Sequence, residues 1–265
     1  MSQRPQRFAS PAVWSLRVSR RPADGLRAVT VAAAVPPDSD AVLDVGCGDG
    51  SVLERLAGLL PGRCLVGVDL HAAALLAARR AVGRRLALAV ADAAALPLRD
   101  RSFAAVICTE VLEHLPAGVF EAAVGELARL ARDAVIVSVP NRERLGRRRV
   151  QCPVCRRDFH AFGHLRAFSP ATLRTLLPGF TATAIREIGP RRDERAGAYD
   201  PAWRRDRLPA ALLVCPECGW EGTGRDAGIT PGRPAARLAS RVAGTLLDRC
   251  GRRRWLLAVY RRDPD

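Results

Sequence analysis

The chain has 265 residues, of which 48% are hydrophobic and 26% are charged. This length suits one α/β domain with insertions, and the apolar content is enough to bury a sizeable core. No apolar run approaches the roughly 18 residues that a membrane span needs. No apolar segment with a small-residue cleavage site follows the scattered N-terminal arginines, so we expect a cytoplasmic protein.

The net charge of +15 is unevenly distributed along the chain. Residues 41–140 hold ten arginines and eleven acidic residues, whereas the rest of the chain holds thirty-two arginines and sixteen acidic residues. One interpretation is a surface for an anionic partner, such as nucleic acid, a phosphorylated carrier or an acidic membrane face. The other is the compositional bias of a GC-rich genome, because the chain contains no lysine.

Residues 1–40 are rich in Pro and Arg, with a predicted short helix around Pro22–Val35, and form either a lid or a frayed tail. Strand-like apolar runs and helical patterns then alternate over residues 41–140, which predicts βαβ units and a parallel sheet. Because the strands are nearly continuous apolar runs, helices should cover both faces. The predicted strands are Ala41–Val45, Cys64–Asp69, Leu86–Ala91, Phe103–Thr109 and Ala134–Val139, and the helices between them are Gly50–Leu60, Ala72–Val82 and Gly118–Arg132.

The regular alternation ends at Pro140, and the remainder consists of core segments separated by two insertions. Residues 141–168 carry an arginine cluster and a first cysteine pair, and residues 189–250 carry a second pair and a predicted helix, Ala235–Leu247. Between them, residues 169–188 return to the core with helix Ser169–Leu177, which Ser169 caps, and a sixth strand, Phe180–Ile188. Residues 251–265 hold the last predicted strand, Trp255–Tyr260.

The strongest local motif is VLDVGCGDG at residues 42–50, where a buried strand ends in three glycines at alternating positions and a helix follows. Glycines at such a position let the backbone turn sharply and approach a ligand without a Cβ in the way. A glycine-rich loop alone does not identify its ligand. Here the spacing is G-x-G-x-G rather than G-x-G-x-x-G, and no Gly-Lys-Ser/Thr follows for a nucleotide phosphate.

Two aspartates at strand ends narrow the choice of ligand. Asp69 ends the second strand, about twenty residues after the glycines, where a carboxylate can accept hydrogen bonds from both ribose hydroxyls. Asp92 ends the third strand, where it can meet the amino group of adenine. Each could instead be an ordinary strand-end cap. Two of them in register with the glycine loop favour a nucleoside-binding site at the carboxyl edge of the sheet.

These motifs resemble the class I S-adenosylmethionine (SAM)-dependent methyltransferases of the broad group that modifies small molecules and lipids. The resemblance covers roughly residues 41–188 plus the final strand, and it implies a doubly wound, Rossmann-like α/β fold with a seven-stranded sheet. The matching motifs are specific for SAM as the cofactor, but they say almost nothing about the methyl acceptor. The matching stretches are VLDVGCGDG at 42–50, VGVDL at 66–70, ADAAALPLRDRSFAAVICTEVLEHL at 91–115, VIVSVPN at 135–141 and HLRAFSPATLRTLLPGF at 164–180.

The resemblance also implies roles for individual residues. Asp69 would hold the ribose, Asp92 with Ala93 the adenine, and Glu110 would lie near the methionine end. The methionine part of SAM would be held by Asp44, Gly46 and Gly48, and the expected cofactor site also includes Cys47, Gly50 and Leu70.

Because SAM carries an activated methyl group, the protein has to align the acceptor and exclude water. His114 is the candidate general base if the acceptor holds a proton, although it could equally be a structural polar residue. Glu110, Glu113, His114 and His164 also resemble the ligand arrangement of the small-RNA 2′-O-methyltransferases of the Hen1 type, which would suit Mg²⁺ or Mn²⁺. The same E-x-x-E-H pattern occurs in relatives that bind no metal.

Two Cys-x-x-Cys pairs, Cys152 with Cys155 and Cys215 with Cys218, are typical of zinc knuckles. Both insertions should leave the sheet at its carboxyl edge, so the four thiolates could bind one structural Zn²⁺ in a cap above the methyl-transfer site. His160 is a substitute ligand. Redox-active dithiols are the alternative, but neither pair starts a helix after a strand. The isolated Cys64 and Cys108 lie in strand-like runs and should be small buried residues.

The sequence therefore predicts a SAM-dependent methyltransferase acting on an oxygen or nitrogen atom of a small-molecule or lipid-linked acceptor, which could be anionic. An RNA methyltransferase is the alternative, with the zinc cap and Arg142, Arg144 and Arg147–Arg149 gripping phosphates. Against it, only 5% of the residues are aromatic, so bases would find few stacking partners. A third hypothesis is a binding protein that zinc holds together and that keeps its SAM site only as an evolutionary remnant. The oligomeric state does not follow from the sequence.

Overall fold

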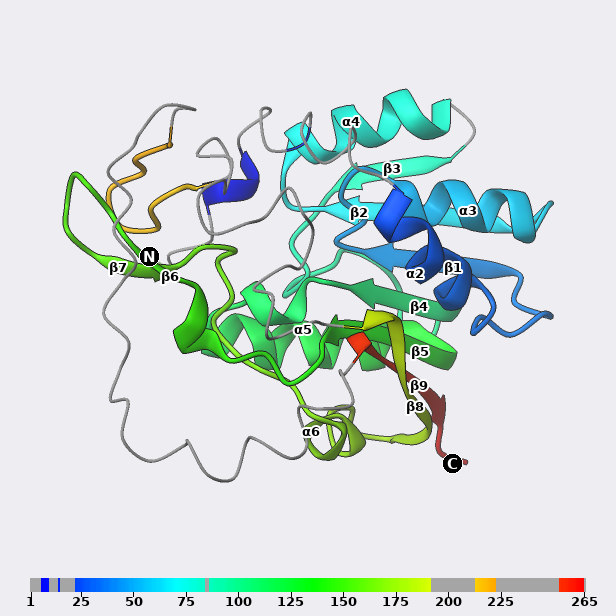
Figure 1. The fold of residues 1–265 in the computed structure, drawn as a ribbon. Helices are drawn as coiled ribbons and strands as arrows, with labels where there is room; N and C mark the ends of the chain where they lie inside the picture. Colours follow the sequence, from blue (N-terminus) through cyan, green and yellow to red (C-terminus); the bar gives the residue numbers. More distant parts are fainter. Residues whose placement is uncertain are drawn as a thin grey trace.

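The computed structural model describes residues 6–9, 14, 22–83, 86–191, 213–222 and 253–264. Seven strands form one sheet in the order β3-β2-β1-β4-β5-β9-β8, and a separate hairpin, β6–β7, projects from it (Figure 1). The strands are β1 (Ala41–Val45), β2 (Cys64–Asp69), β3 (Ala87–Val90), β4 (Phe103–Thr109), β5 (Ala131–Pro140), β6 (Arg149–Gln151), β7 (Asp158–His160), β8 (Phe180–Arg191) and β9 (Arg253–Arg262). The helices are α2 (Pro22–Ala32), α3 (Ser51–Leu59), α4 (Ala72–Val82), α5 (Ala117–Leu130) and α6 (Pro170–Arg174).

The first five strands of the sheet run parallel, as the sequence predicts. The chain begins in the middle with β1, moves outward through β2 to β3, and then crosses back to β4 on the other side of β1. This reversal of direction makes a switch point between β1 and β4. In open α/β sheets, ligands bind in the crevice beyond the carboxyl ends of the strands at such a point.

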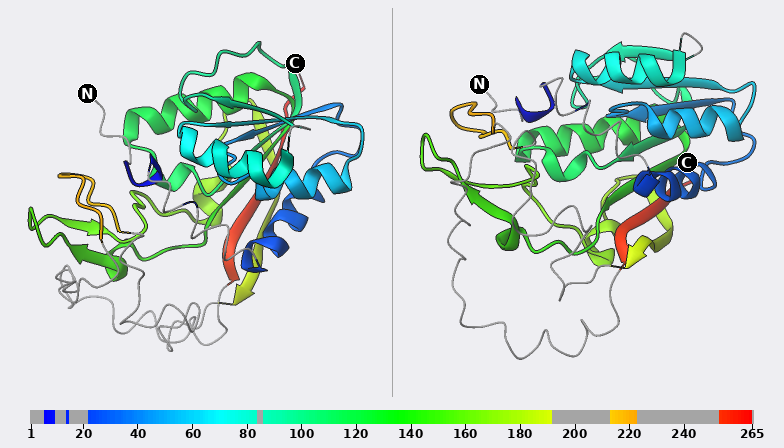
Figure 2. Two further views of the ribbon diagram at one scale, coloured as in Figure 1. Left: turned by 90° about the horizontal axis from the view of Figure 1, so that it is seen from above. Right: turned by 45° about the horizontal axis from the view of Figure 1, so that its top comes forward.

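Helices cover both faces of the sheet (Figure 2). On one face α2 and α3 contribute Val31, Leu53 and Leu56 to an apolar cluster, and Leu75 of α4 packs against it. On the other face α5 and α6 contribute Leu127, Leu130 and Leu173 to a second cluster. The central strand β4 is buried along its whole length, because both clusters use its side chains.

The last strand, β9, is antiparallel to both of its neighbours, β5 and β8. The final strand of the chain therefore lies between β5 and β8. β9 is an internal strand, and its Trp255 and Tyr260 are almost completely buried. The hydroxyl of Tyr260 donates a hydrogen bond of 2.6 Å to the carbonyl of Leu173, which fastens α6 to the sheet.

Several predicted boundaries differ from the observed ones. β5 begins at Ala131, three residues early, because α5 passes into the strand without a turn. Helix α6 has five residues rather than nine. The expectation for Cys64 is wrong, since this residue opens β2 and is exposed, whereas Cys108 is buried. The predicted helix Ala235–Leu247 lies outside the described residues. None of the helices in the described ranges combines the length and apolar character of a membrane span.

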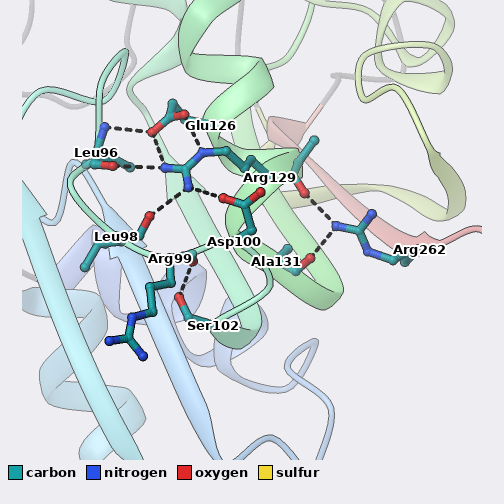
Figure 3. Close-up of polar contacts among 10 residues, drawn as sticks. Leu96, Leu98, Arg99, Asp100, Ser102, Glu126, Arg129, Ala131 and Arg262 are labelled. Carbon is teal, nitrogen blue, oxygen red and sulfur yellow. Dashed lines mark hydrogen bonds and ion pairs between the residues drawn. The ribbon is translucent and has the colours of Figure 1, made fainter.

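The loop after β3, which leads from the third strand to β4, is held by one arginine of α5 (Figure 3). Arg129 donates hydrogen bonds to the carbonyls of Leu96 and Leu98, at 2.9 and 2.7 Å, and pairs with Asp100 at 2.6 Å. Its remaining N–H groups bind the carboxylate of Glu126, which also accepts the backbone N–H of Leu96 at 2.7 Å. One guanidinium thus fixes the course of the loop that begins with Asp92.

We expect Arg129→Met to lower the free energy of unfolding by about 2 kcal/mol, because two carbonyls and a half-buried carboxylate lose a charged donor. Arg132→Met is the matched control. Arg132 pairs only with exposed carboxylates of Asp40 and Asp133, so its loss should change stability by about 0.5 kcal/mol or less. Urea unfolding of both variants measures the difference, and equal destabilisation would contradict this account of the loop.

Candidate active site at the carboxyl edge of the sheet

The turn after β1 adopts a backbone conformation that favours glycine. Gly46, Gly48 and Gly50 have φ values of 74°, 55° and 73°. The N–H groups of Gly46 and Cys47 both donate to the carbonyl of Val68, at 2.8 and 2.9 Å, so the turn is tied to the end of β2. A Cβ at Gly46 would lie 2.3 Å from a methyl group of Val111. The turn therefore passes close to the segment after β4 and leaves its backbone facing the crevice.

A cavity opens at this edge of the sheet, with about 1090 Å³ of empty space when its part open to solvent is included. Most residues of the expected cofactor site line it, as does the expected base His114. These lining residues are Gly46, Cys47, Gly48, Asp69, Leu70, Asp92, Ala93 and Glu110. Asp44 and Gly50 do not line the cavity; Asp44 is buried within β1, and Gly50 is the N-cap of helix α3.

Asp69 joins the loops that follow β1 and β2. One of its carboxylate oxygens accepts the N–H of Gly48 at 3.0 Å, and the other accepts the N–H of His71 at 2.9 Å. On the next strand, Asp92 accepts the N–H of Ala94 at 3.1 Å. Both carboxylates accept hydrogen bonds from backbone N–H groups of nearby loops, and both residues line the same cavity. Each aspartate can therefore cap a strand end and also bind a ligand.

Asp44 is a buried carboxyl group in the middle of β1. It is 1% exposed, and neither of its oxygens has a hydrogen-bond partner among the described residues. Burial raises the pKa of this carboxyl to about 7, and the attraction of Arg27 only partly opposes the effect. The group therefore titrates near neutral pH under the floor of the cavity.

Arg27 is a site residue that the sequence analysis missed. It projects from α2 into the cavity, 8% exposed, and its guanidinium lies 3.7 Å from the carboxylate of Glu110. Glu110 has a positive φ of 57° and accepts the indole N–H of Trp255 at 2.8 Å. The available signal was an arginine on the apolar face of α2, next to the buried Ala28 and Val31. A buried arginine needs a partner, and Glu110 supplies one.

Residues of the N-terminal segment close one side of the cavity. Trp14 is 4% exposed and its indole donates a hydrogen bond of 2.7 Å to the carbonyl of Phe8. Its ring lies where a side chain at Gly48 would have to go, at 3.0 Å from a Cβ built there. The ring of Phe8 meets that of His114 edge-on, with centroids 4.9 Å apart. This position agrees with the predicted lid, which stays a prediction.

Comparison with known proteins supports the interpretation of this cavity. Residues 42–134, which span β1 to β5 and contain most of the lining residues, match the family model of the methyltransferase domain. The central part of this chain is therefore similar to a methyltransferase domain. A curated relative, the demethylmenaquinone methyltransferase of Roseiflexus castenholzii, is 37% identical over 109 residues. That match covers 41% of this chain and 45% of the relative, so the chain spans less than half of the relative's length.

Solved structures share the fold of this chain over most of its length. A chain of the complex between the Haloferax volcanii Trm112 methyltransferase activator and a methyltransferase superposes with a TM-score of 0.58 and is 18% identical; the match covers 97% of this chain and 98% of that chain. The methyltransferase domain of bacterial CtHen1-CN gives a TM-score of 0.53 at 18% identity, with coverage of 90% and 98%. At this identity the likeness shows the fold alone.

Beside this cavity lies a buried cluster of three histidines and two glutamates. His164 contacts the carboxylate of Glu143 through Nδ1, and Nε2 of His160 lies 3.8 Å from the same carboxylate. The rings of His114 and His164 meet edge-on, with centroids 4.7 Å apart. Glu113 is completely buried, and burial together with the charge of Glu110 raises its pKa well above the usual value. The cluster joins the segment after β4 to the first cysteine insertion.

Four cysteines from the two insertions converge beyond this cluster. The Sγ atoms of Cys152 and Cys218 are 3.6 Å apart, those of Cys155 and Cys215 are 3.5 Å apart, and all four lie within 4.8 Å of one another. Residues 213–222 lie beside the β6–β7 hairpin (Figures 1 and 2). A small apolar cluster joins the two segments; it contains Val150, Cys152, Phe159, Ala161, Leu213 and Cys215.

The two cysteine turns have the same backbone pattern. In each turn the first cysteine donates its N–H to the residue five positions on, Arg157 at 2.9 Å and Trp220 at 2.8 Å. In each turn its carbonyl accepts the N–H of the fourth residue on, which has a positive φ: 62° at Arg156 and 71° at Gly219. Burial opposes ionisation of Cys152, but the N–H groups of Cys155 and Val154 lower the pKa of its thiol to about 7.

The raised pKa of Asp44 predicts a loss of stability as the pH rises from about 4 to about 7. The unfolded chain releases this proton near pH 4, whereas the folded chain holds it to about pH 7, so the contribution is complete at acid pH and lost at alkaline pH. Asp44→Asn should remove this slope. At pH 8 the variant should be more stable than the wild type, on the order of 1.4 kcal/mol for each pH unit between the two pKa values.

Urea unfolding at pH 5 and pH 8 measures this effect, with Asp40→Asn as the control. Asp40 is an exposed carboxylate whose pKa the side chain of Arg132 lowers, so its removal should leave the difference between pH 5 and pH 8 unchanged. If Asp44→Asn keeps the full pH dependence of the wild type, the buried carboxyl is not its source.

Proposed function

We propose that this chain is a SAM-dependent methyltransferase that transfers a methyl group to an oxygen or nitrogen atom of a small-molecule or lipid-linked acceptor. The observation that carries the proposal is the cavity at the β1/β4 switch point. There the three-glycine turn, Asp69 and Asp92 face one space within the residues that match the methyltransferase family. This arrangement suits a ligand that combines a nucleoside with a charged amino-acid tail.

Different lining residues would bind different parts of SAM along the length of the cavity. Asp69 would accept hydrogen bonds from the ribose hydroxyls, and Asp92 with Ala93 would hold the adenine. Arg27 stands at the far end, beside Glu110, where its guanidinium would pair with the methionine carboxylate. When bound, SAM supplies a methyl group already activated on a sulfonium. The protein contributes position, with Trp14 and Phe8 excluding water from one side.

His114 would act as the general base. Its Nδ1 lies 3.2 Å from the carbonyl of Gly163, and a carbonyl only accepts, so Nδ1 carries the proton. In the neutral ring the lone pair then resides on Nε2, which can take a proton from an acceptor hydroxyl or amine. Gly163 has a φ of 71°, so the carbonyl that orients His114 depends on a left-handed turn.

An apolar acceptor fits the other side of the cavity. Leu115, Pro116 and Val119 line it next to His114. The relative with 37% identity is named for the methylation of demethylmenaquinone, a lipid-linked ring, which supports an acceptor of this class. An anionic acceptor or carrier would also meet the exposed Arg142 and Arg144 of the first insertion. These arginines would serve an RNA acceptor as well, so experiment has to separate the two.

The test is transfer from radiolabelled SAM into a cell extract that is then fractionated into RNA, lipid and small polar pools. We expect label in the lipid or small polar pool with the wild type. Asp69→Ala should abolish transfer and SAM binding, because the ribose loses its acceptor and the turn at Gly48 loses its anchor. Asp40→Ala, which removes an exposed carboxylate at the opposite end of β1, is the matched control and should keep full activity.

Label in RNA would replace the proposed acceptor by the alternative while keeping the enzyme class. Calorimetry with SAM adds an independent check, since Asp69→Ala with unchanged affinity would overturn the cofactor assignment.

We further propose that Cys152, Cys155, Cys215 and Cys218 bind one structural Zn²⁺. A tetrahedral zinc with Zn–S bonds of about 2.3 Å places its sulfur atoms about 3.8 Å apart. The observed separations of 3.5 and 3.6 Å between cysteines of different pairs are close to this value. Four thiolates complete the tetrahedral coordination of zinc and leave no position for substrate. The metal would therefore hold the two insertions together rather than take part in catalysis.

We expect about one zinc per chain by elemental analysis, reduced to near zero in the double variant Cys152→Ser/Cys155→Ser. The cap should then loosen, because its apolar cluster is small and cannot replace the metal. Cys64→Ser is the control, since this cysteine is exposed and remote in sequence from both pairs, and its zinc content should match the wild type. A stably folded wild type without metal would refute the site.

A further inference from the structure

Glu110 is held by three elements that lie far apart in the sequence. It directly follows β4 and has a positive φ of 57°, a conformation that a residue with a side chain rarely adopts. Its N–H donates a hydrogen bond of 2.8 Å to the carbonyl of Ser138 on β5, and its Oε2 accepts the indole N–H of Trp255 on β9 at 2.8 Å. Its Oε1 lies 3.7 Å from the guanidinium of Arg27 on α2. The backbone and one carboxylate oxygen of Glu110 are therefore both fixed.

The second carboxylate oxygen of Glu110 can receive a ligand. Oε1 is buried and has no hydrogen-bond partner among the described residues, and Glu110 lines the cavity. At 3.7 Å the guanidinium of Arg27 attracts this oxygen but does not donate a hydrogen bond to it. Glu110 thus offers an acceptor to a positively charged donor in the cavity, for which a carboxylate is a strong partner.

Trp255 contacts both members of this ion pair, although it is not among the residues that line the cavity. Besides its hydrogen bond to Glu110, its ring lies beside the guanidinium of Arg27, with 5.3 Å between the guanidinium carbon and the ring centroid. The ring is 1% exposed and packs against Gly189 of β8, where a Cβ would lie 2.4 Å from it. A ring confined in this way keeps its N–H directed at one oxygen of Glu110.

We propose that Trp255 is a positioning residue for the amino-acid end of SAM, an inference that rests on the function proposed above. It would hold Glu110 and Arg27 side by side as two opposite charges, which complement the ammonium and the carboxylate of the methionine tail. Oε1 of Glu110 would accept the ammonium, and Arg27 would pair with the carboxylate. The order of the strands supports this direction, because Asp69 and Asp92 follow β2 and β3, whereas Glu110 follows β4 on the other side of β1.

The cofactor site would therefore depend on the last strand of the sheet. Trp255 lies in β9, beyond residues 42–134 that match the methyltransferase family, and pairs with Pro140 at the carboxyl end of β5. Loss of its indole N–H would release Glu110, but no group expected to bind adenine or ribose. The effect on affinity should therefore be confined to the amino-acid tail of the cofactor.

Calorimetry with two nucleosides tests this effect, because S-adenosylhomocysteine carries the amino-acid tail and 5′-methylthioadenosine does not. Trp255→Phe keeps an aromatic ring but loses the N–H donor. We expect this variant to bind S-adenosylhomocysteine about 10-fold more weakly than the wild type, and to change the affinity for 5′-methylthioadenosine by less than about twofold.

Glu110→Gln should show the same selective loss, by about 10-fold or more, because the ammonium loses a charged partner. The double variant should bind S-adenosylhomocysteine no more weakly than Glu110→Gln alone. Phe keeps a ring beside Arg27, so the indole N–H acts only through Glu110, and the two losses should not add.

Tyr260→Phe is the matched control. It also removes a buried hydrogen-bond donor from an aromatic residue of β9, but the Tyr260 hydroxyl binds the carbonyl of Leu173, and neither residue lines the cavity. This variant should bind both nucleosides like the wild type. Melting curves verify that each variant is folded.

Wild-type affinity for S-adenosylhomocysteine in folded Trp255→Phe, or an equal loss for both nucleosides, would overturn the role of Trp255. If Trp255→Phe does not fold, Glu110→Gln decides in its place, since the inference requires a loss confined to the ligand with the tail. A wild type that binds neither SAM nor S-adenosylhomocysteine would instead overturn the proposed function, and this inference with it.

Discussion

The structure depends on one junction, where the turn after β1 is tied to the end of β2. The carbonyl of Val68 accepts two N–H groups of the glycine turn, and the carboxylate of Asp69 accepts a third from Gly48. These hydrogen bonds fix the carboxyl ends of β1 and β2 beside each other. They also leave the backbone of the turn facing the crevice. The acid that would bind ribose also shapes the loop that would bind methionine, so pocket and scaffold form one hydrogen-bonded unit.

The sequence predicts the core of this fold because its signals are local. Continuous apolar strands, the three glycines and the strand-end aspartates each act over a few residues, and the observed β1, β2, α4 and β4 match the predicted ranges. Boundaries were less accurate where no turn residue marks them, as at the passage from Leu130 into Ala131. The prediction that Cys64 is buried was wrong for a related reason. An apolar run does not show which of its residues lies at the exposed end of a strand.

The parts of the site that escaped prediction are contacts between segments distant in sequence. Arg27 and Glu110 are 83 positions apart in the chain and meet only because the fold brings α2 to the segment after β4. The residues of the E-x-x-E-H pattern do not share one helical face. Glu110 has a positive φ and precedes the 3₁₀ helix Leu112–His114, so it turns toward Trp255 while Glu113 turns toward His164. Spacing along a sequence predicts a shared face only if the backbone is regular.

Buried charge connects these features. A chain that places Asp44, Glu110 and Glu113 at one sheet edge must compensate three carboxyl groups in a region of low polarity. Arg27 and Trp255 stabilise the carboxylate of Glu110 by an ion pair and a hydrogen bond. The carboxyl group of Asp44 is instead protonated at acid and neutral pH. Glu113 is completely buried, and burial together with the charge of Glu110 raises its pKa well above the usual value, so this carboxyl group keeps its proton to a higher pH than an exposed glutamate. The first insertion docks beside this group, because Leu165 donates its N–H to the carbonyl of Glu113 and the rings of His114 and His164 meet edge-on, so the insertion helps to keep the carboxyl group buried.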